Sequence, residues 1–190
     1  NTFDDFSRRN RALTDTYEPG STMKSIVMAM LLDENLVEEN NIVNTENGRF
    51  RIKGALISDT HEFSTLTVRG VLEQSSNIGM VKRSEKINSN DFYKGLRDCG
   101  FGNFTSIDLL GETRGNLKKP NQFSRISKAF MSHGYEISVT PIQMVMAYSA
   151  IINGGNLLQL YKKKKILESN GEVEEEFETN KIRRVISEET

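Results

Sequence analysis

The sequence contains few of the residues that mark several common classes of protein. Cys99 is the one cysteine among 190 residues, so no disulfide can form within the chain. The two histidines, His61 and His133, lie far apart in the sequence, and we expect ordinary turn or wall positions for both. Nothing here indicates a disulfide framework or a metal site, and we expect neither a metal nor a cofactor.

A charge excess and long apolar runs are lacking as well. The 25 basic and 26 acidic residues give a net charge of −1, which excludes the strongly basic surface typical of nucleic-acid-binding proteins. The longest apolar run, Ile26 to Leu32, is too short to span a bilayer. No signal-peptide pattern is visible and the first residue is Asn1, so we expect one domain cut from a longer protein.

The motif that is present, Ser-x-x-Lys at Ser21 to Lys24, occurs once in the chain. Residues three apart on a helix share a face, and a lysine with a lowered pKa can take the proton of a serine hydroxyl. Lys24 lies beside an apolar stripe at helical spacing, formed by Met23, Ile26, Val27, Met30 and Leu31. A helix-capping serine followed by a surface lysine has the same spacing, so the motif alone leaves both interpretations open.

A second polar motif, Ser75-Ser76-Asn77, is the only Ser-x-Asn and interrupts two helical patterns at 66–74 and 78–87. Serine and asparagine also cap helices and form turns, which is the simpler interpretation of this segment. The two motifs together, in this order, are more specific than either alone. They indicate a serine nucleophile with a lysine base.

The rest of the chain predicts more helix than strand. Further helices are expected at 22–36, at 90–99, where we expect a buried Cys99, and from Thr140-Pro141 to 152, with a short strand at 49–52 and a long connection at 102–120. Asn170-Gly171 predicts a two-residue turn in an outer hairpin at 161–178, which would place Lys165 opposite Glu176 and Lys163 opposite Glu178. A partner-docking role for this hairpin stays open.

Three stretches resemble the transpeptidase domain of the class B penicillin-binding proteins. They are the approach to the serine from Arg9 to Ser21, the segment from Leu66 to Gly79, and the late segment from His133 to Gly155. The resemblance runs from about residue 8 to residue 155. It implies an α/β (α+β) penicillin-binding, serine transferase fold, of which residues 1–190 form a partial, mainly helical transpeptidase domain with the outer hairpin.

Two departures from the family accompany the resemblance. No lysine is followed by Ser-Gly or Thr-Gly, so we expect the family's Lys-Ser/Thr-Gly strand, and its first strands, to lie outside these residues. That strand helps to form the oxyanion hole in the family, so we expect this chain alone to be inactive. Glu136 stands where the family more often has glycine, which puts the local turn geometry in question.

The resemblance implies a peptidoglycan D,D-transpeptidase without a metal or cofactor. Ser21 would attack the D-Ala-D-Ala end of a stem peptide, and Lys24 would take its proton. Ser75 would relay a proton to the leaving amine, while Asn77 would bind substrate and orient Lys24; Ser75 and Asn77 would therefore also bind substrate. β-Lactam antibiotics would acylate Ser21 in place of the peptide.

The resemblance also implies a cellular setting. It is closer to the septal, cell-division type of enzyme, with division proteins and a glycosyltransferase as partners and no nucleic acid. The catalytic domain would be extracytoplasmic or periplasmic, on an N-terminal anchor in the inner membrane. Two rival functions remain: a serine β-lactamase or β-lactam sensor, and a non-catalytic cell-wall or division scaffold.

Overall fold

The computed structural model describes residues 9–190, so residue 8, at the expected start of the resemblance, lies outside it. Its helices are α1 (Arg11–Thr14), α2 (Met23–Asp33), α3 (Val68–Glu73), α4 (Asn77–Ser84), α5 (Ser89–Asp98), α6 (Ser127–Met131) and α7 (Pro141–Ile152), with 3-10 turns η2 (Gly20–Thr22), η3 (Glu46–Gly48) and η4 (Pro120–Gln122). Its strands are β1 (Ile42–Asn44), β2 (Arg49–Ile52), β3 (Ala55–Ser58), β4 (Thr65–Thr67), β5 (Asn156–Leu158), β6 (Lys165–Leu167), β7 (Val173–Glu176) and β8 (Lys181–Arg184).

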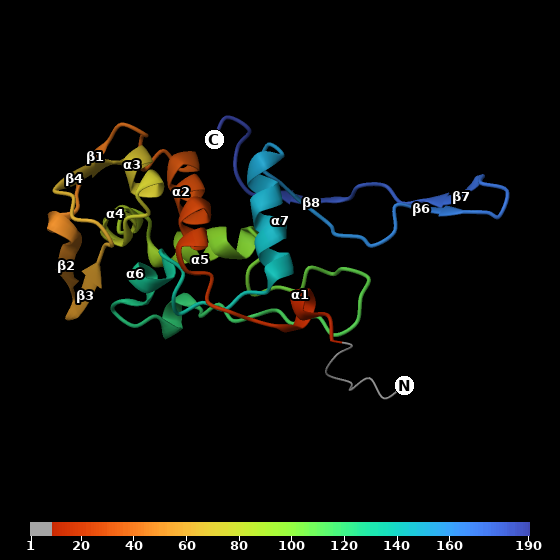
Figure 1. Cartoon of the computed structure of the whole chain (residues 1–190), viewed down its shortest axis with the longest axis horizontal. Helices are drawn as coiled ribbons and strands as arrows, with labels where there is room; N and C mark the ends of the chain where they lie inside the picture. Colours follow the sequence, from red (N-terminus) through yellow and green to blue (C-terminus); the bar gives the residue numbers. More distant parts are fainter. Residues whose placement is uncertain (1–8) are drawn as a thin grey trace.

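Helix α2 is the centre of the hydrophobic core. It stands between α4 and α7 in Figure 1 and contacts both, together with α5. The predicted apolar stripe is buried, and Met28 and Ala29 are buried as well, so α2 is covered on more than one face. No helix within residues 9–190 has the length and apolar character needed to cross a membrane.

The strands form four separate two-stranded antiparallel sheets in the described residues. These pair β1 with β4, β2 with β3, β5 with β8, and β6 with β7. The strand predicted at 49–52 is confirmed as β2, and it returns through a tight turn into β3. Strand β3 ends immediately before Asp59 and so places this aspartate beside the start of α4.

Three predicted helices have different bounds, and the pattern at 78–87 forms α4, which begins at Asn77 and ends at Ser84. The prediction at 66–74 is wrong at its start: Leu66 pairs with Val43 in the β1–β4 ladder, and α3 begins after Thr67, whose hydroxyl accepts the Gly70 N–H at 3.0 Å. A threonine cap and a cross-strand pair outweigh the apolar periodicity there. The predicted 22–36 helix is likewise shortened to α2, after which Asn35 takes a positive φ of 54°.

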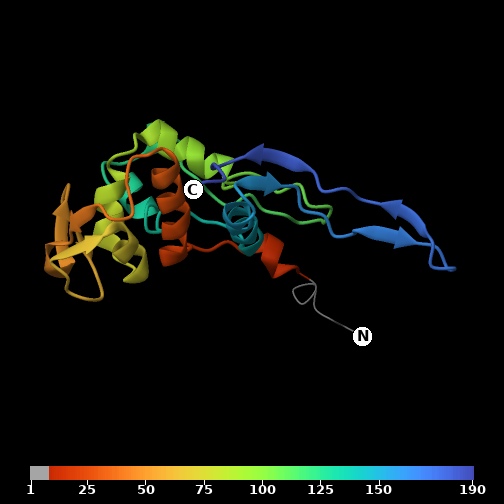
Figure 2. The ribbon, with the colours of Figure 1, turned by 90° about the horizontal axis from the view of Figure 1, so that it is seen from above.

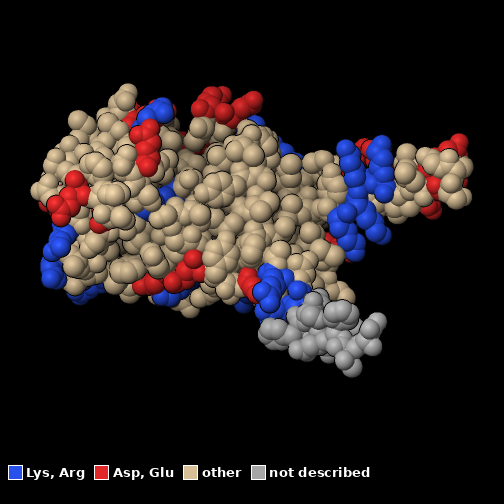
Figure 3. All heavy atoms as spheres, viewed as in Figure 1, with Lys and Arg blue, Asp and Glu red and all other residues tan. Residues whose placement is uncertain are grey.

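The outer hairpin of β6 and β7 projects from the helical body (Figures 1 and 2). Lys165 pairs with Glu176 as predicted, with Nζ 3.1 Å from the carboxylate. The prediction of a two-residue turn is wrong. The Glu168 carbonyl accepts the Gly171 N–H, and the Glu168 N–H donates to the Glu172 carbonyl, which closes a three-residue loop. The register of the ladder shifts after Ile166. The ladder does not reach Lys163 and Glu178. Basic side chains gather where the hairpin begins (Figure 3).

Candidate active site

Ser21 lies exposed in the 3-10 turn η2, directly before the buried helix α2. Two contacts of the next residue hold this turn: Thr22 Oγ1 donates to the Pro19 carbonyl at 2.7 Å, and Tyr148 of α7 donates its hydroxyl to the Thr22 carbonyl at 2.7 Å. Within residues 9–190, Ser21 Oγ makes no hydrogen bond of its own. The hydroxyl is therefore accessible and uncommitted on a fixed backbone.

Lys24, one turn further, is buried with 2% of its surface exposed. Its Nζ donates to the carbonyl oxygen of Ser75 and to Ser75 Oγ, the latter at 3.0 Å, across 51 residues of sequence. Burial lowers the pKa of Lys24 from 10.5 to about 8, and the negative charge of Asp59 opposes this shift. The interpretation of Lys24 as a surface lysine is wrong, because α2 is the core helix.

Ser75 owes its position to an unusual backbone at the junction of α3 and α4. Its φ is +52°, a left-handed conformation that is rare for serine and costs free energy. The chain reverses there because Ser76 follows as the cap of α4, with its Oγ accepting the Gly79 N–H at 2.9 Å. This reversal directs both oxygens of Ser75 to Lys24.

Asn77 lies beside this pair without contacting Lys24. Its Nδ2 donates to the carbonyl of Ser58 at 2.8 Å, and Asn77 is partly exposed. The structure thus brings Lys24 and Ser75 together and places Asn77 at the same turn, but in residues 9–190 it forms no hydrogen bond from Asn77 to Lys24. Among the described residues, Asn77 therefore has no direct hydrogen bond through which it could orient Lys24.

Asp59 is the polar residue of this site that sequence reasoning missed. Its Oδ1 accepts the N–H groups of Asn77 at 2.6 Å and Ile78 at 3.0 Å, and its Oδ2 accepts the hydroxyl of Ser76 at 2.5 Å. A carboxylate at these N–H groups stabilises the start of α4 and fixes the Ser75 turn. An aspartate after a strand is typical of an ordinary turn, so the sequence offered no signal for this role.

Replacing Asp59 with asparagine should lower the pKa of Lys24 further below 8, because it removes the one negative charge that opposes the effect of burial. Asp59→Ala should also destabilise the fold by about 1 kcal/mol through loss of the α4 cap. NMR titration of the Lys24 side chain and urea denaturation measure the two effects. Asp91→Asn, in the first turn of α5, is the matched control. An unchanged Lys24 midpoint in Asp59→Asn would contradict the electrostatic coupling.

The segment 133–139 forms the wall that holds the serine turn. Gly134 accepts the Gly20 N–H at 3.0 Å, and a Cβ at Gly134 would lie 2.0 Å from the Gly20 carbonyl oxygen. Val139 and Tyr17 exchange backbone hydrogen bonds of 2.9 and 3.0 Å. His133 is buried, its Nδ1 lies 2.8 Å from the Ala129 carbonyl, and burial lowers its pKa.

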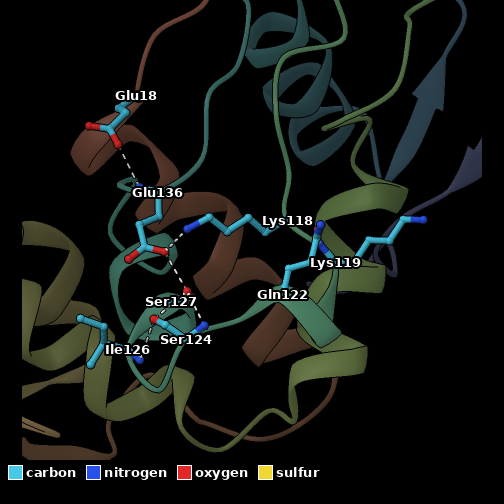
Figure 4. Close-up of polar contacts among 8 residues, drawn as sticks. All are labelled: Glu18, Lys118, Lys119, Gln122, Ser124, Ile126, Ser127 and Glu136. Atoms are coloured by element: carbon cyan, nitrogen blue, oxygen red, sulfur yellow. Dashed lines mark hydrogen bonds and ion pairs between the residues drawn. The ribbon is translucent and has the colours of Figure 1, made fainter.

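Glu136 belongs to the same wall, and its backbone keeps the conformation that suits glycine, with φ +56°. Glutamate at this position therefore occupies a left-handed turn that glycine adopts more readily. Figure 4 shows its carboxylate turned toward Lys118 and Ser127, and its N–H bonded to Glu18.

Other candidate groups carry no chemistry in this arrangement. Cys99 is buried as predicted, and burial raises the pKa of its thiol to about 12. Across residues 9–190, no group of three or more His, Cys, Asp or Glu side chains is placed to hold a metal ion. What the site offers is a serine hydroxyl, a buried amine and a second serine hydroxyl, the set that nucleophilic acyl transfer requires.

Comparison with known proteins places the chain in a family. The penicillin binding protein transpeptidase domain profile matches residues 1–190. The chain is 38% identical over 143 residues to the peptidoglycan D,D-transpeptidase FtsI of Escherichia coli K12, which covers 75% of this chain and 24% of that protein. It is 35% identical over 164 residues to the probable peptidoglycan D,D-transpeptidase PenA of Neisseria flavescens, covering 86% and 40%. The chain thus spans less than half the length of these curated relatives.

Solved structures show the same fold. The transpeptidase domain of Burkholderia pseudomallei penicillin-binding protein 3 superposes with a TM-score of 0.85 at 34% identity, covering 96% of this chain and 53% of that one. Penicillin binding protein 3 of Mycobacterium tuberculosis, solved with ampicillin, gives 0.85 at 27% identity, covering 98% and 42%. The expected α/β penicillin-binding fold is confirmed. The chain belongs to the penicillin-binding protein transpeptidase domain family, in its class B branch.

Proposed function

We propose that the protein containing this domain is a peptidoglycan D,D-transpeptidase that works through an acyl-enzyme on Ser21. One observation carries the proposal: an exposed serine stands one helical turn before a buried lysine whose pKa is lowered to about 8. An amine of that pKa is largely neutral above pH 8, and near pH 7 roughly one molecule in ten carries the neutral form that a base requires.

The proposed reaction begins when Lys24 Nζ takes the proton of Ser21 Oγ. The oxygen attacks the carbonyl of the penultimate D-alanine, and the bond to the terminal D-alanine breaks. Ser75 Oγ, 3.0 Å from Lys24 Nζ, passes that proton to the leaving amine. An acceptor amine from a second stem peptide then attacks the ester and restores Ser21. Lys24 and Ser21 are not hydrogen-bonded before substrate arrives, and such contacts often tighten only in the reacting complex.

Asn77 is proposed to bind substrate from the edge of the site, where it is partly exposed and held by Ser58. The third family motif, with its oxyanion donor, is not among these 190 residues, so the proposed activity belongs to the whole protein. We propose the extracytoplasmic side of the membrane as its location, since peptidoglycan lies there. The names of the FtsI relatives support a septal role, with division proteins and a glycosyltransferase as proposed partners.

Acylation by β-lactams follows from the same chemistry, and the Mycobacterium tuberculosis relative was solved with ampicillin. The full-length protein incubated with benzylpenicillin should gain the mass of one penicilloyl group, and Ser21→Ala should gain none. Ser25→Ala, on the same helix and half-buried, is the control and should be acylated normally.

The persistence of the adduct separates the proposed function from that of a β-lactamase. A transpeptidase should keep its penicilloyl group for many minutes, whereas a β-lactamase would release it at once and consume penicillin catalytically. A folded protein with no adduct at all would refute the acyl-enzyme proposal and favour a scaffold.

A further inference from the structure

Glu136 has a strained backbone, and both its carboxylate and its N–H are hydrogen-bonded. A side chain at φ +56° costs free energy relative to glycine, so its retention there calls for a compensating interaction. The strain lies in the wall segment, two residues after Gly134, which touches Gly20.

The compensating interaction is a charged cluster, which we call the Glu136 clamp and define as Glu136, Lys118 and Ser127. Lys118 Nζ lies 2.6 Å from Glu136 Oε2, and Ser127 Oγ donates to the same oxygen at 2.7 Å. Ser127 is fully buried, and its own oxygen accepts the Ser124 N–H at 3.0 Å. The side chains of Lys118 and Glu136 are only 36% and 26% exposed, so this pair is better fixed than a surface ion pair.

The clamp reaches the serine turn through one backbone hydrogen bond. The Glu136 N–H donates to Glu18 Oε1 at 2.9 Å, across 118 residues of sequence (Figure 4). Glu18 is followed by Pro19, whose ring fixes its φ, and then by Gly20 and Ser21. A shift of Glu18 therefore acts on Ser21 through only Pro19 and Gly20, and the Gly20 N–H is itself bonded to the Gly134 carbonyl.

The two contacts of Glu136 separate its side chain from its backbone N–H, and Lys118 holds the side chain. Lys118 and Ser127 draw the Glu136 carboxylate to the opposite side, which leaves its N–H free to face Glu18.

We propose that the Glu136 clamp is a positioning device that sets the place of Ser21 by fixing Glu18, an inference that rests on the proposed acylation of Ser21. Glu136 is a positioning residue and touches no reacting atom. Glycine would adopt this turn without strain, whereas Glu136 is held in it by its ion pair with Lys118.

The decisive variant is Glu136→Gly, which removes the clamp and also relieves the strained φ. We expect a folded protein at least as stable as the wild type, in which acylation at saturating β-lactam is about tenfold slower because Ser21 is less well placed. Exchange of the Gly20 amide hydrogen, which is bonded to Gly134, should become about tenfold faster, while the amides of α5 stay unchanged. A residue with a merely structural role would lower stability and leave both readouts at their wild-type values.

Substitutions of Lys118 provide the rescue test. Lys118→Arg keeps the ion pair and should acylate like the wild type, whereas Lys118→Met should behave like Glu136→Gly. Glu174→Gly, on the exposed strand β7, controls for the loss of a glutamate as such. All variants are made in the full-length protein.

The outcomes separate the two proposals. If the wild type is not acylated, the proposed function fails, and Gly20 exchange in Glu136→Gly and Lys118→Met still decides whether the clamp fixes the turn. If the wild type is acylated but both variants match it in acylation and in Gly20 exchange, the clamp is refuted.

Discussion

Lys24→Met should slow the acylation of Ser21 by β-lactams about a thousandfold, the range seen when a general base is removed. Methionine is similar in length and apolar, so it can occupy the buried position on α2, yet it cannot take a proton. Stopped-flow or quenched mass measurement of the acylation rate tests this. Lys128→Met is the matched control, because Lys128 is also a partly buried lysine whose pKa burial lowers, and it should acylate normally.

The same variant should be more stable than the wild type at neutral pH. Below its folded pKa of about 8, Lys24 is charged in both the folded and unfolded states, and the folded state carries the cost of burying that charge. The fall of the pKa from 10.5 to about 8 corresponds to about 3 kcal/mol, a cost that is relieved as pH rises from 8 toward 10.5. Denaturation at pH 7 should show the gain, reduced by the loss of the hydrogen bonds to Ser75.

The wild-type rate of acylation should rise with pH and level off above about 8, where Lys24 is neutral. Asp59 and His133 are the nearby charged or titratable groups, and burial lowers the pKa of His133 below its usual 6.5, so His133 titrates at lower pH than Lys24. A rate that is independent of pH between 6 and 9, or an unaffected Lys24→Met, would contradict the role of Lys24 as base.

Gly134→Ala is expected to have the second large effect, on both stability and acylation. The new Cβ would lie 2.0 Å from the carbonyl oxygen of Gly20 and 2.4 Å from its nitrogen, and φ at this position is +87°. Since the obstacle is backbone, it can yield only if the serine turn moves. Strain and overpacking together should cost about 3 to 5 kcal/mol, and acylation should fall about a hundredfold in the molecules that fold.

Gly54→Ala separates the clash from the backbone strain. Gly54 lies in the β2–β3 turn with φ +93°, and a Cβ there meets nothing within 4 Å. Its replacement should therefore cost only about 1 kcal/mol and leave acylation unchanged. Urea denaturation and the acylation rate are measured on both variants. If Gly134→Ala costs no more than Gly54→Ala, the close contact with Gly20 does not hold the serine turn.

Local signals in the sequence predicted local features well. The Thr140-Pro141 start of α7 is confirmed, with the Thr140 hydroxyl accepting the Gln143 N–H at 3.3 Å and Gln143 Oε1 accepting the Thr140 N–H at 3.0 Å. Strand β2 and the Lys165–Glu176 pair are confirmed for the same reason, since periodicity and turn chemistry act between near neighbours. The predictions failed at Leu66, where pairing with the distant strand β1 replaced the expected helix, and at the hairpin turn, where Ser169 adds a third residue to the loop.

The sequence by itself determined which residues we propose as the reactive groups and their order: Ser21 and Lys24 one turn apart, then Ser75 and Asn77. Only the tertiary structure decided how these groups act on one another. Burial of α2 lowers the pKa of Lys24, and Asp59 fixes the backbone turn that directs Ser75 toward Lys24. Gly134 and Glu136 hold the segment that leads to Ser21. The pKa of a lysine depends on the atoms around it, and some of these belong to segments far away in the sequence, such as Ser75, which lies 51 residues on; no local pattern records them.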